Sequence, residues 1–86
     1  MITIKIIPAA EKDIIDIYNH ILHQYKAPTT ARRFLDGIYE EVKKLEILPN
    51  RGAKYGKQYR KIMYKKHRII YRYNEEENAV YIIAVE

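Results

Sequence analysis

The sequence contains no cysteine, and it has only three glycines and three prolines in 86 residues. Without cysteine, disulfide bonds, a thiolate nucleophile and a cysteine-ligated zinc site are excluded, and a cytoplasmic location is expected. No apolar run approaches the roughly 20 residues that cross a bilayer, so no contact with a membrane is expected. A chain of this length forms one domain, residues 1–86. A multidomain enzyme, a receptor and a secreted disulfide scaffold are thereby excluded.

Acidic residues are missing from one long stretch of the chain. The sequence has 16 Lys and Arg against 11 Asp and Glu, a net charge of +5, and no acid lies between Glu46 and Glu75. The stretch carries these basic residues: Arg51, Lys54, Lys57, Arg60, Lys61, Lys65, Lys66, Arg68 and Arg72. Such a patch favours a polyanion as the partner, most often nucleic acid. A merely solubilising role is the alternative, although soluble surfaces usually mix both signs.

Hydrophobic periodicity predicts an α+β fold. Alternation predicts a strand over 2–7, and apolar residues three and four apart predict helices over 10–25 and 30–48. Three further strands are predicted over 58–64, 67–73 and 79–85. Short links make the helices an antiparallel hairpin and the last three strands an antiparallel meander. The predicted order is strand–helix–helix–strand–strand–strand, with the hairpin packed on the sheet.

Proline and glycine mark special positions in the two predicted helices. Pro28, followed by Thr29 and Thr30, predicts the end of the first helix and an N-cap for the second. Gly37 lies inside the second helix, where glycine costs about 1 kcal/mol relative to alanine. A close approach of the helix backbone to the first helix or to the sheet would explain it.

The Lys65-Lys66 turn predicts how the first two strands of the meander pair. If Tyr64 opposes His67, then Met63 opposes Arg68, Lys61 opposes Ile70 and Tyr59 opposes Arg72. Opposed residues share a sheet face, so one face carries Tyr59, Lys61, Met63, Arg68, Ile70 and Arg72. The other carries Arg60, Ile62, Tyr64, His67, Ile69 and Tyr71 and is predicted to pack on the helices. A shift of one residue would exchange Arg60 and Lys61 between the faces.

The usual motifs for cofactors and metals are absent. No glycine-rich phosphate loop follows a predicted strand, and the basic stretch holds no carboxylate pair for two metal ions. His20 and His23 share a helix face, but no third metal ligand accompanies them. The sequence therefore predicts neither a cofactor nor a metal.

The basic meander is the remaining place for chemistry. Lys and Arg on strands can hold phosphates and tyrosine can stack on bases, and the candidate contacts to nucleic acid or another target are Lys54, Lys57, Arg72 and Tyr59. The same cations can stabilise the phosphorane of a metal-free RNA cleavage. Such cleavage needs a general base and a general acid, and the nearby proton carriers are His67, Tyr59 and Tyr64. Plain packing in the sheet is the alternative role for each of these three.

Several segments together resemble the RelE/ParE toxin superfamily. They are Ala10 to Ile14, Ala31 to Leu48, Leu48 to Gly52, Tyr59 to Ile62 and His67 to Arg72, followed by Val80 to Val85. The segments occur in the family's order, and the last two are the most specific. The resemblance implies a growth-arresting, plasmid-stabilising toxin of a type II toxin–antitoxin pair. It also implies a helix hairpin on a curved antiparallel sheet, and a small, acidic, DNA-binding antitoxin encoded next to the toxin.

The resemblance implies two alternative activities and a set of catalytic candidates. ParE-like members poison DNA gyrase, whereas RelE-like members cut messenger RNA in the ribosomal A site. Arg68 matches the family's strand arginine, and Arg60 or Lys61 matches the basic position on the preceding strand. RelE-like nucleases carry an Arg and a proton-donating Tyr or His beyond the last strand, whereas this sequence ends at Glu86.

The ending at Glu86 and the long helix hairpin favour gyrase inhibition over ribosome-dependent RNA cleavage. A truncated, inactive toxin or a simple basic RNA-binding domain would also fit the sequence.

Overall fold

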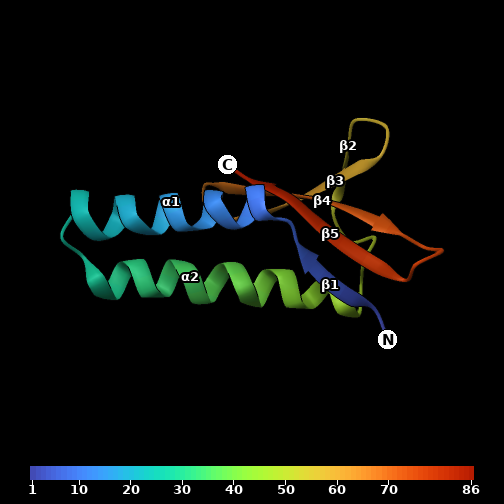
Figure 1. The fold of residues 1–86 in the computed structure, drawn as a ribbon, viewed down its shortest axis with the longest axis horizontal. Helices are drawn as coiled ribbons and strands as arrows, with labels where there is room; N and C mark the ends of the chain where they lie inside the picture. Colours follow the sequence, from blue (N-terminus) through green and yellow to red (C-terminus); the bar gives the residue numbers. More distant parts are fainter.

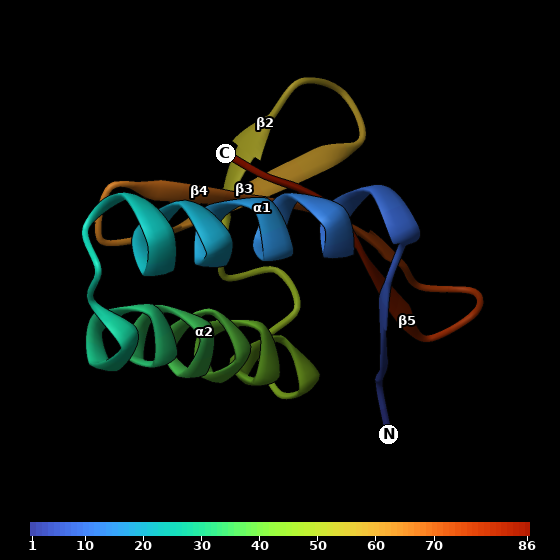
Figure 2. The same ribbon diagram turned by 60° about the vertical axis from the view of Figure 1, so that its left-hand side comes forward.

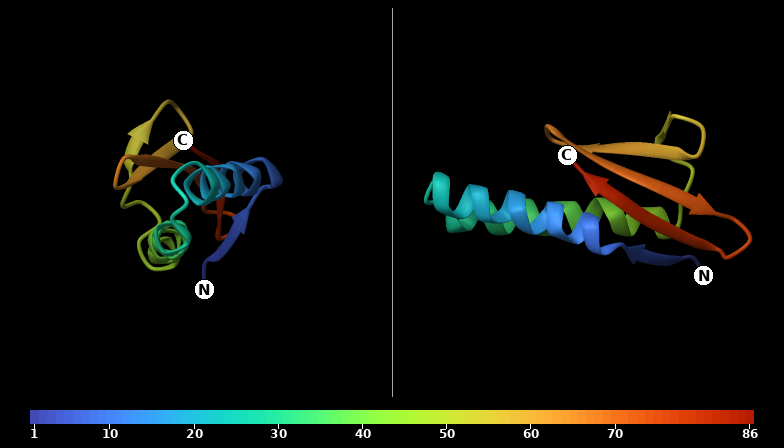
Figure 3. Two further views of the ribbon diagram at one scale, coloured as in Figure 1. Left: turned by 90° about the vertical axis from the view of Figure 1, so that its left-hand side faces the viewer. Right: turned by 45° about the horizontal axis from the view of Figure 1, so that its top comes forward.

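The structure, a computed structural model that describes residues 1–86, is a five-stranded sheet with a helix hairpin against one face (Figure 1). The helices are α1 (Pro8–Gln24) and α2 (Pro28–Lys43), and a 3-10 turn, η1 (Lys44–Glu46), continues α2. The strands are β1 (Thr3–Ile6), β2 (Ala53–Tyr55), β3 (Tyr59–Tyr64), β4 (His67–Asn74) and β5 (Ala79–Val85). The hairpin projects past the sheet, which gives the molecule extents of 43 × 25 × 21 Å (Figure 3).

Neither helix combines the length and the apolar character needed to span a membrane.

The strand order is β1–β5–β4–β3–β2, so β1 lies beside the last strand of the chain (Figure 2). The predicted α+β class and the predicted order of strands and helices are confirmed. The sheet is mixed, however, because β1 and β5 run parallel, from Thr3 opposite Ala79 to Ile6 opposite Ile82. Parallel neighbours need a long crossover connection, which the two helices provide. Strand β2 was not predicted from the sequence, because three residues are too few to show alternation.

Both helices begin earlier than predicted, with proline as their first residue. Pro8 and Pro28 occupy N1, where the missing N–H has no intrahelical partner to lose. Ala27 is the N-cap of α2 and no side chain caps it, so the predicted threonine N-cap is wrong. At its other end α2 tightens into η1, and Leu48 is 60% exposed. The predicted helix end at residue 48 is therefore also wrong.

One apolar core lies between the hairpin and the sheet. Its fully buried larger side chains are Ile14, Ile38, Leu45, Ile69, Tyr71, Val80 and Ile82. Burying each of the aliphatic ones stabilises the fold by about 1.5–3 kcal/mol. No charged residue is buried, so all the cations of the basic stretch reach the surface.

The register of β3 and β4 is the predicted one. The opposed pairs are Arg60–Tyr71, Lys61–Ile70, Ile62–Ile69, Met63–Arg68 and Tyr64–His67. The predicted core face is also confirmed, because Ile62, Ile69 and Tyr71 belong to the core cluster. We call the other face, which the helices do not cover, the open face of the sheet.

A β-bulge between β4 and β5 decides which side chains of β5 reach the core. The register shifts between Ile70 and Tyr71, so that Ile69 pairs with Val85 whereas Tyr71 pairs with Ile82. Strict alternation would put Ile82 and Val85 on opposite faces, yet both are buried. The extra residue on β5 turns the end of the strand so that Val85 faces the helices.

Gly37 is explained by a side chain rather than by a backbone. A Cβ at this position would overlap the ring of Tyr64, which lies over the glycine. The Tyr64 hydroxyl donates to the carbonyl oxygen of Arg33 over 3.3 Å, and the ring also packs near Phe34. The close approach to the sheet is therefore confirmed, with a tyrosine of β3 as the neighbour.

Candidate functional site

The open face carries four of the seven predicted site residues. They are Tyr59, Lys61, Arg68 and Arg72, which alternate with core-facing neighbours along β3 and β4. Arg60 points to the opposite face, the one that also holds Tyr71. The structure therefore separates the two basic positions of β3, and only Lys61 lies on the same face as Arg68.

Lys61 and Arg68 converge on Tyr55, a residue that the sequence analysis did not select. The Lys61 Nζ lies 5.5 Å from the centroid of the Tyr55 ring, and the Arg68 Cζ lies 5.8 Å from it. Tyr55 ends the edge strand β2, which places its ring beside β3. Each cation–π contact of this kind stabilises by about 0.5–1 kcal/mol at an exposed site. Without a prediction of β2, no sequence signal placed this ring on the sheet.

Glu86 lies against the same arginine. Its Oε1 is 2.8 Å from Arg68 Nη2, and the two residues exchange backbone N–H···O bonds of 2.9 Å in both directions. The pairing of β4 with β5 thus continues one residue past the end of β5. The contact of Glu86 with Arg68 was not predicted from the sequence, because it depends on the bulged register of β4 and β5. We refer to Tyr55, Lys61, Arg68 and Glu86 as the Tyr55 cluster.

Arg60 holds the loop that precedes β2. Its Nη1 donates to the carbonyl oxygens of Asn50, over 3.2 Å, and Gly52, over 2.8 Å. These bonds tie β3 to the loop and direct the guanidinium away from the open face. Among the predicted catalytic residues, Arg60 is the one that the structure does not bring together with the others.

Tyr71 anchors the same loop from within the core. Its hydroxyl accepts the N–H of Gly52 over 2.9 Å and donates to the carbonyl oxygen of Pro49 over 2.7 Å. Burial raises the pKa of Tyr71, so the hydroxyl stays protonated and able to donate.

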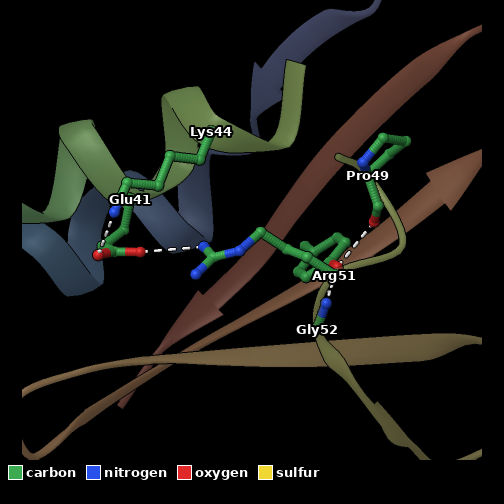
Figure 4. Close-up of polar contacts among 6 residues, drawn as sticks. Glu41, Lys44, Pro49, Arg51 and Gly52 are labelled. Carbon is green, nitrogen blue, oxygen red and sulfur yellow. Dashed lines mark hydrogen bonds and ion pairs between the residues drawn. The ribbon is translucent and has the colours of Figure 1, made fainter. Parts of the chain in front are cut away.

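The loop is also fixed from the side of α2, where Glu41 accepts from Arg51 and from Lys44 over 3.0 Å each (Figure 4). The hydrogen bonds from Lys44 and Arg51 lower the pKa of Glu41. Together with Arg60 and Tyr71, these contacts set the position from which β2 departs.

Lys54 and Lys57 follow this anchored loop and are exposed. Lys54, on β2, lies opposite Arg60 of β3. Lys57 belongs to the turn between β2 and β3, in which Gly56 has a φ of 73°. Both border a shallow hollow of about 280 Å³ together with Tyr59. They do not belong to the Tyr55 cluster.

Arg72 and Tyr59 border a second shallow hollow on the open face. The hollow has a volume of about 180 Å³ and is shared with Glu77 and Tyr81. Tyr81, on β5, lies opposite Arg72 of β4, and the Tyr81 hydroxyl donates to the carboxylate of Glu77. The acidic β4–β5 turn therefore lowers the positive charge at this end of the face.

A larger apolar groove lies on the helix side, between the far half of the hairpin and the β3–β4 turn. Its volume is about 690 Å³, and its walls include Ile17, Ile21, Tyr25, Phe34, Tyr64 and His67. Lys65 and Lys66 stand at its edge. This groove was not predicted from the sequence, because it forms between elements far apart in the chain.

His67 and Tyr64, two of the predicted proton carriers, lie in this groove. The His67 ring meets the edge of Phe34 with centroids 5.0 Å apart, and burial lowers the pKa of His67. Arg68 is its neighbour in sequence but points to the open face, since successive strand residues alternate. The two proton carriers and the paired cations therefore lie on opposite faces of the sheet.

Comparisons with known proteins agree with this fold. A model of the ParE toxin of the type II toxin–antitoxin system, parDE, matches residues 4–86. No match to a curated protein is found by sequence. Among solved structures, the chain is similar to a protein of the chromosomal ParDE toxin–antitoxin system from P. aeruginosa, with 22% identity and a TM-score of 0.84. That likeness covers 100% of this chain and 95% of the other, and at this identity it shows the fold. Because the family match spans nearly the whole chain, the protein belongs to the ParE toxin family of type II toxin–antitoxin systems.

Proposed function

We propose that this toxin arrests bacterial growth by inhibiting DNA gyrase in the cytoplasm. The observation that carries the proposal is the separation of His67 and Tyr64 from Lys61 and Arg68 by the thickness of the sheet. RNA cleavage needs proton carriers within hydrogen-bond reach of the reacting oxygens, and these two do not meet the cations. A toxin that blocks its target by binding has no such requirement, and gyrase poisoning is the activity that the resemblance implies for ParE-like members.

Ribosome-dependent cleavage of messenger RNA is the second candidate. The observation that favours it is the shared position of Lys61, Arg68 and Tyr59 on the open face. In this arrangement the cations would stabilise a phosphorane and Tyr59 would transfer a proton. The pairing of Arg68 with Glu86 counts against it, since the carboxylate already takes up part of the positive charge.

We further propose that the partner antitoxin places an apolar segment in the groove beside the hairpin. The groove is large for an 86-residue chain and mostly apolar, and exposed apolar surface of this kind marks protein interfaces. Lys65 and Lys66 at its edge suit an acidic partner. Ile21→Lys is expected to weaken antitoxin binding about tenfold or more, whereas Ile15→Lys on the exposed side of α1 is the matched control.

Gyrase supercoiling with purified toxin tests the proposed target. Added toxin is expected to inhibit supercoiling, and added antitoxin is expected to restore it. In cells, induced expression should give filaments and a DNA-damage response. Translation arrest with cuts in translated codons, together with unaffected supercoiling, would instead establish the second candidate. Arg68→Ala should then abolish those cuts while far-ultraviolet circular dichroism stays unchanged.

A further inference from the structure

We propose that His67 makes antitoxin binding in the groove beside the hairpin dependent on pH: the segment binds while the imidazole is neutral and is released when the ring takes up a proton. The inference rests on the antitoxin proposal above and adds a means of regulation to the same site. It does not depend on the target of the toxin, so it holds for gyrase inhibition and for RNA cleavage alike.

His67 lies in the wall of the groove among apolar neighbours. It is the first residue of β4 and is half-buried, and its ring meets the edge of Phe34 with centroids 5.0 Å apart. Ile17 and Ile21 of α1 line the same groove. An apolar segment that fills the groove would therefore cover the exposed part of the imidazole and remove it from water.

On the sheet side, two lysines act against protonation of His67. Lys65 and Lys66 form the turn directly before β4 and stand at the edge of the groove. Burial lowers the pKa of His67, hydrogen bonding to the backbone of Glu86 raises it, and the charge of Lys66 lowers it further. The Glu86 carboxylate itself pairs with Arg68. Because the two lysines at the edge attract the carboxylates of an acidic partner, the imidazole is left to the apolar part of the segment.

On the helix side, no free carboxylate faces the imidazole. Asp16 is the one acid among the lining residues, and its carboxylate lies 2.7 Å from the Lys12 Nζ. His20 also lines the groove but is exposed. The other polar or aromatic lining residues are uncharged: Tyr25, Thr30, Phe34 and Tyr64. An imidazolium under the bound segment would thus lose its water without gaining an anion, which is unfavourable.

The direction of the pH dependence follows from this difference. The imidazole binds a proton more weakly in the complex than in the free toxin, so complex formation releases protons wherever the free ring is protonated. The dissociation constant therefore rises as the pH falls below about 6.5, the ordinary pKa of histidine. One titrating group raises it by at most about tenfold per pH unit.

Isothermal titration of the full chain with the antitoxin encoded next to it tests the inference. Between about pH 7.5 and about pH 5, the dissociation constant is expected to rise about three- to tenfold more in the wild type than in His67→Gln. Groups of the antitoxin that titrate in this range affect both proteins equally and cancel in the comparison. His23→Gln, which removes an exposed imidazole of α1 outside the groove, is the matched control and should behave like the wild type.

A second measurement follows the His67 ring directly. NMR titration of the wild type, over the pH range in which the free toxin stays folded, should give a lower pKa for His67 in the complex than in the free toxin. An equal or higher pKa in the complex would overturn the inference. If His67→Gln loses the circular dichroism of the fold, His67→Phe takes its place in the binding comparison, because it keeps a ring beside Phe34.

The outcomes separate this inference from the antitoxin site on which it rests. If Ile21→Lys leaves binding at about pH 7.5 unchanged, the groove is not the antitoxin site and both proposals fail. If Ile21→Lys weakens binding while the wild type and His67→Gln share one pH dependence, only the inference about His67 is overturned. Tighter binding in acid that disappears in His67→Gln would show an imidazolium paired with an antitoxin carboxylate and would also overturn it. Loss of the pH dependence in His20→Gln alone would assign it to the other imidazole, with the same result.

Discussion

The hydroxyl of Tyr71 donates a hydrogen bond of 2.7 Å to the carbonyl oxygen of Pro49, 22 residues earlier in the chain. The same hydroxyl accepts the N–H of Gly52, so one core side chain fixes both ends of a short loop. A Cβ at Gly52 would approach the Tyr71 ring and the Lys61 carbonyl oxygen to 2.7–2.8 Å. The absence of a side chain at Gly52 is thus what allows β2 to start beside β3.

Tyr71→Phe is predicted to lower the free energy of unfolding by about 1–3 kcal/mol, because the N–H of Gly52 is left buried without an acceptor. Each kcal/mol corresponds to a fall in melting temperature of about 4–8 °C for a domain of this size. Urea unfolding measures the change. Tyr73→Phe is the control, since its hydroxyl makes only an exposed bond of 3.4 Å to Asn78. Equal losses in both variants would show that the loop anchor contributes nothing.

Gly37→Ala is predicted to destabilise the protein by about 1 kcal/mol, because the new methyl group displaces the Tyr64 ring. In an ordinary helix position the same change would stabilise by up to about 1 kcal/mol. The sign should therefore reverse in a Tyr64→Ala background, where the space is empty. Thermal unfolding of the four proteins in this cycle measures the coupling, and additive effects would contradict it.

The acid stability of the fold is predicted to depend on Glu41. Hydrogen bonds from Lys44 and Arg51 lower the pKa of Glu41 below its ordinary value of 4.5. The unfolded chain therefore takes up this proton first, and the contribution of the carboxylate is lost as the pH falls from about 4.5 through the folded pKa. Glu41→Gln should lose less stability than the wild type between pH 7 and about pH 3 in urea titrations. Glu40→Gln, at the exposed neighbouring position, should behave like the wild type.

A separate loss of stability is predicted in mild acid from His67. Burial against Phe34 lowers the pKa of His67 below its ordinary value of 6.5. The unfolded chain is protonated before the folded one, so stability falls as the pH drops below about 6.5 and levels off under the folded pKa. NMR titration of the ring should give a pKa below 6.5. In His67→Gln the fall between about pH 7.5 and about pH 5 should be smaller than in the wild type.

The faces of β3 and β4 were predictable because their determinants are local. A two-residue turn sets the register, and the period of two then assigns every side chain to a face. Lys61 and Arg68 were placed together in this way, and the structure confirms the register on which that placement rests. The family was likewise recognisable from the order of these short segments, and the match over residues 4–86 confirms it.

The first residues of the helices and the position of Tyr55 beside Lys61 and Arg68 were not predictable in the same way. Proline at position 28 fits both a helix stop and a first helical residue, and only the packing of α2 selects the second. The segment around Tyr55 shows no hydrophobic periodicity that would predict a strand, because β2 is a strand only through its pairing with β3. The roles of Arg68, Lys61 and the other site residues remain predictions.

By itself, the sequence determined the class of fold, the register of β3 and β4 and the concentration of positive charge on the strands, since each follows from neighbours within a few residues. Only the tertiary structure decided the parallel pairing of β1 with β5, the bulge that brings Glu86 beside Arg68, and the groove beside the hairpin. These features join residues far apart in the chain, as in the pairing of Thr3 with Ala79. Contacts at such separations depend on how complete elements pack, and no local pattern encodes them.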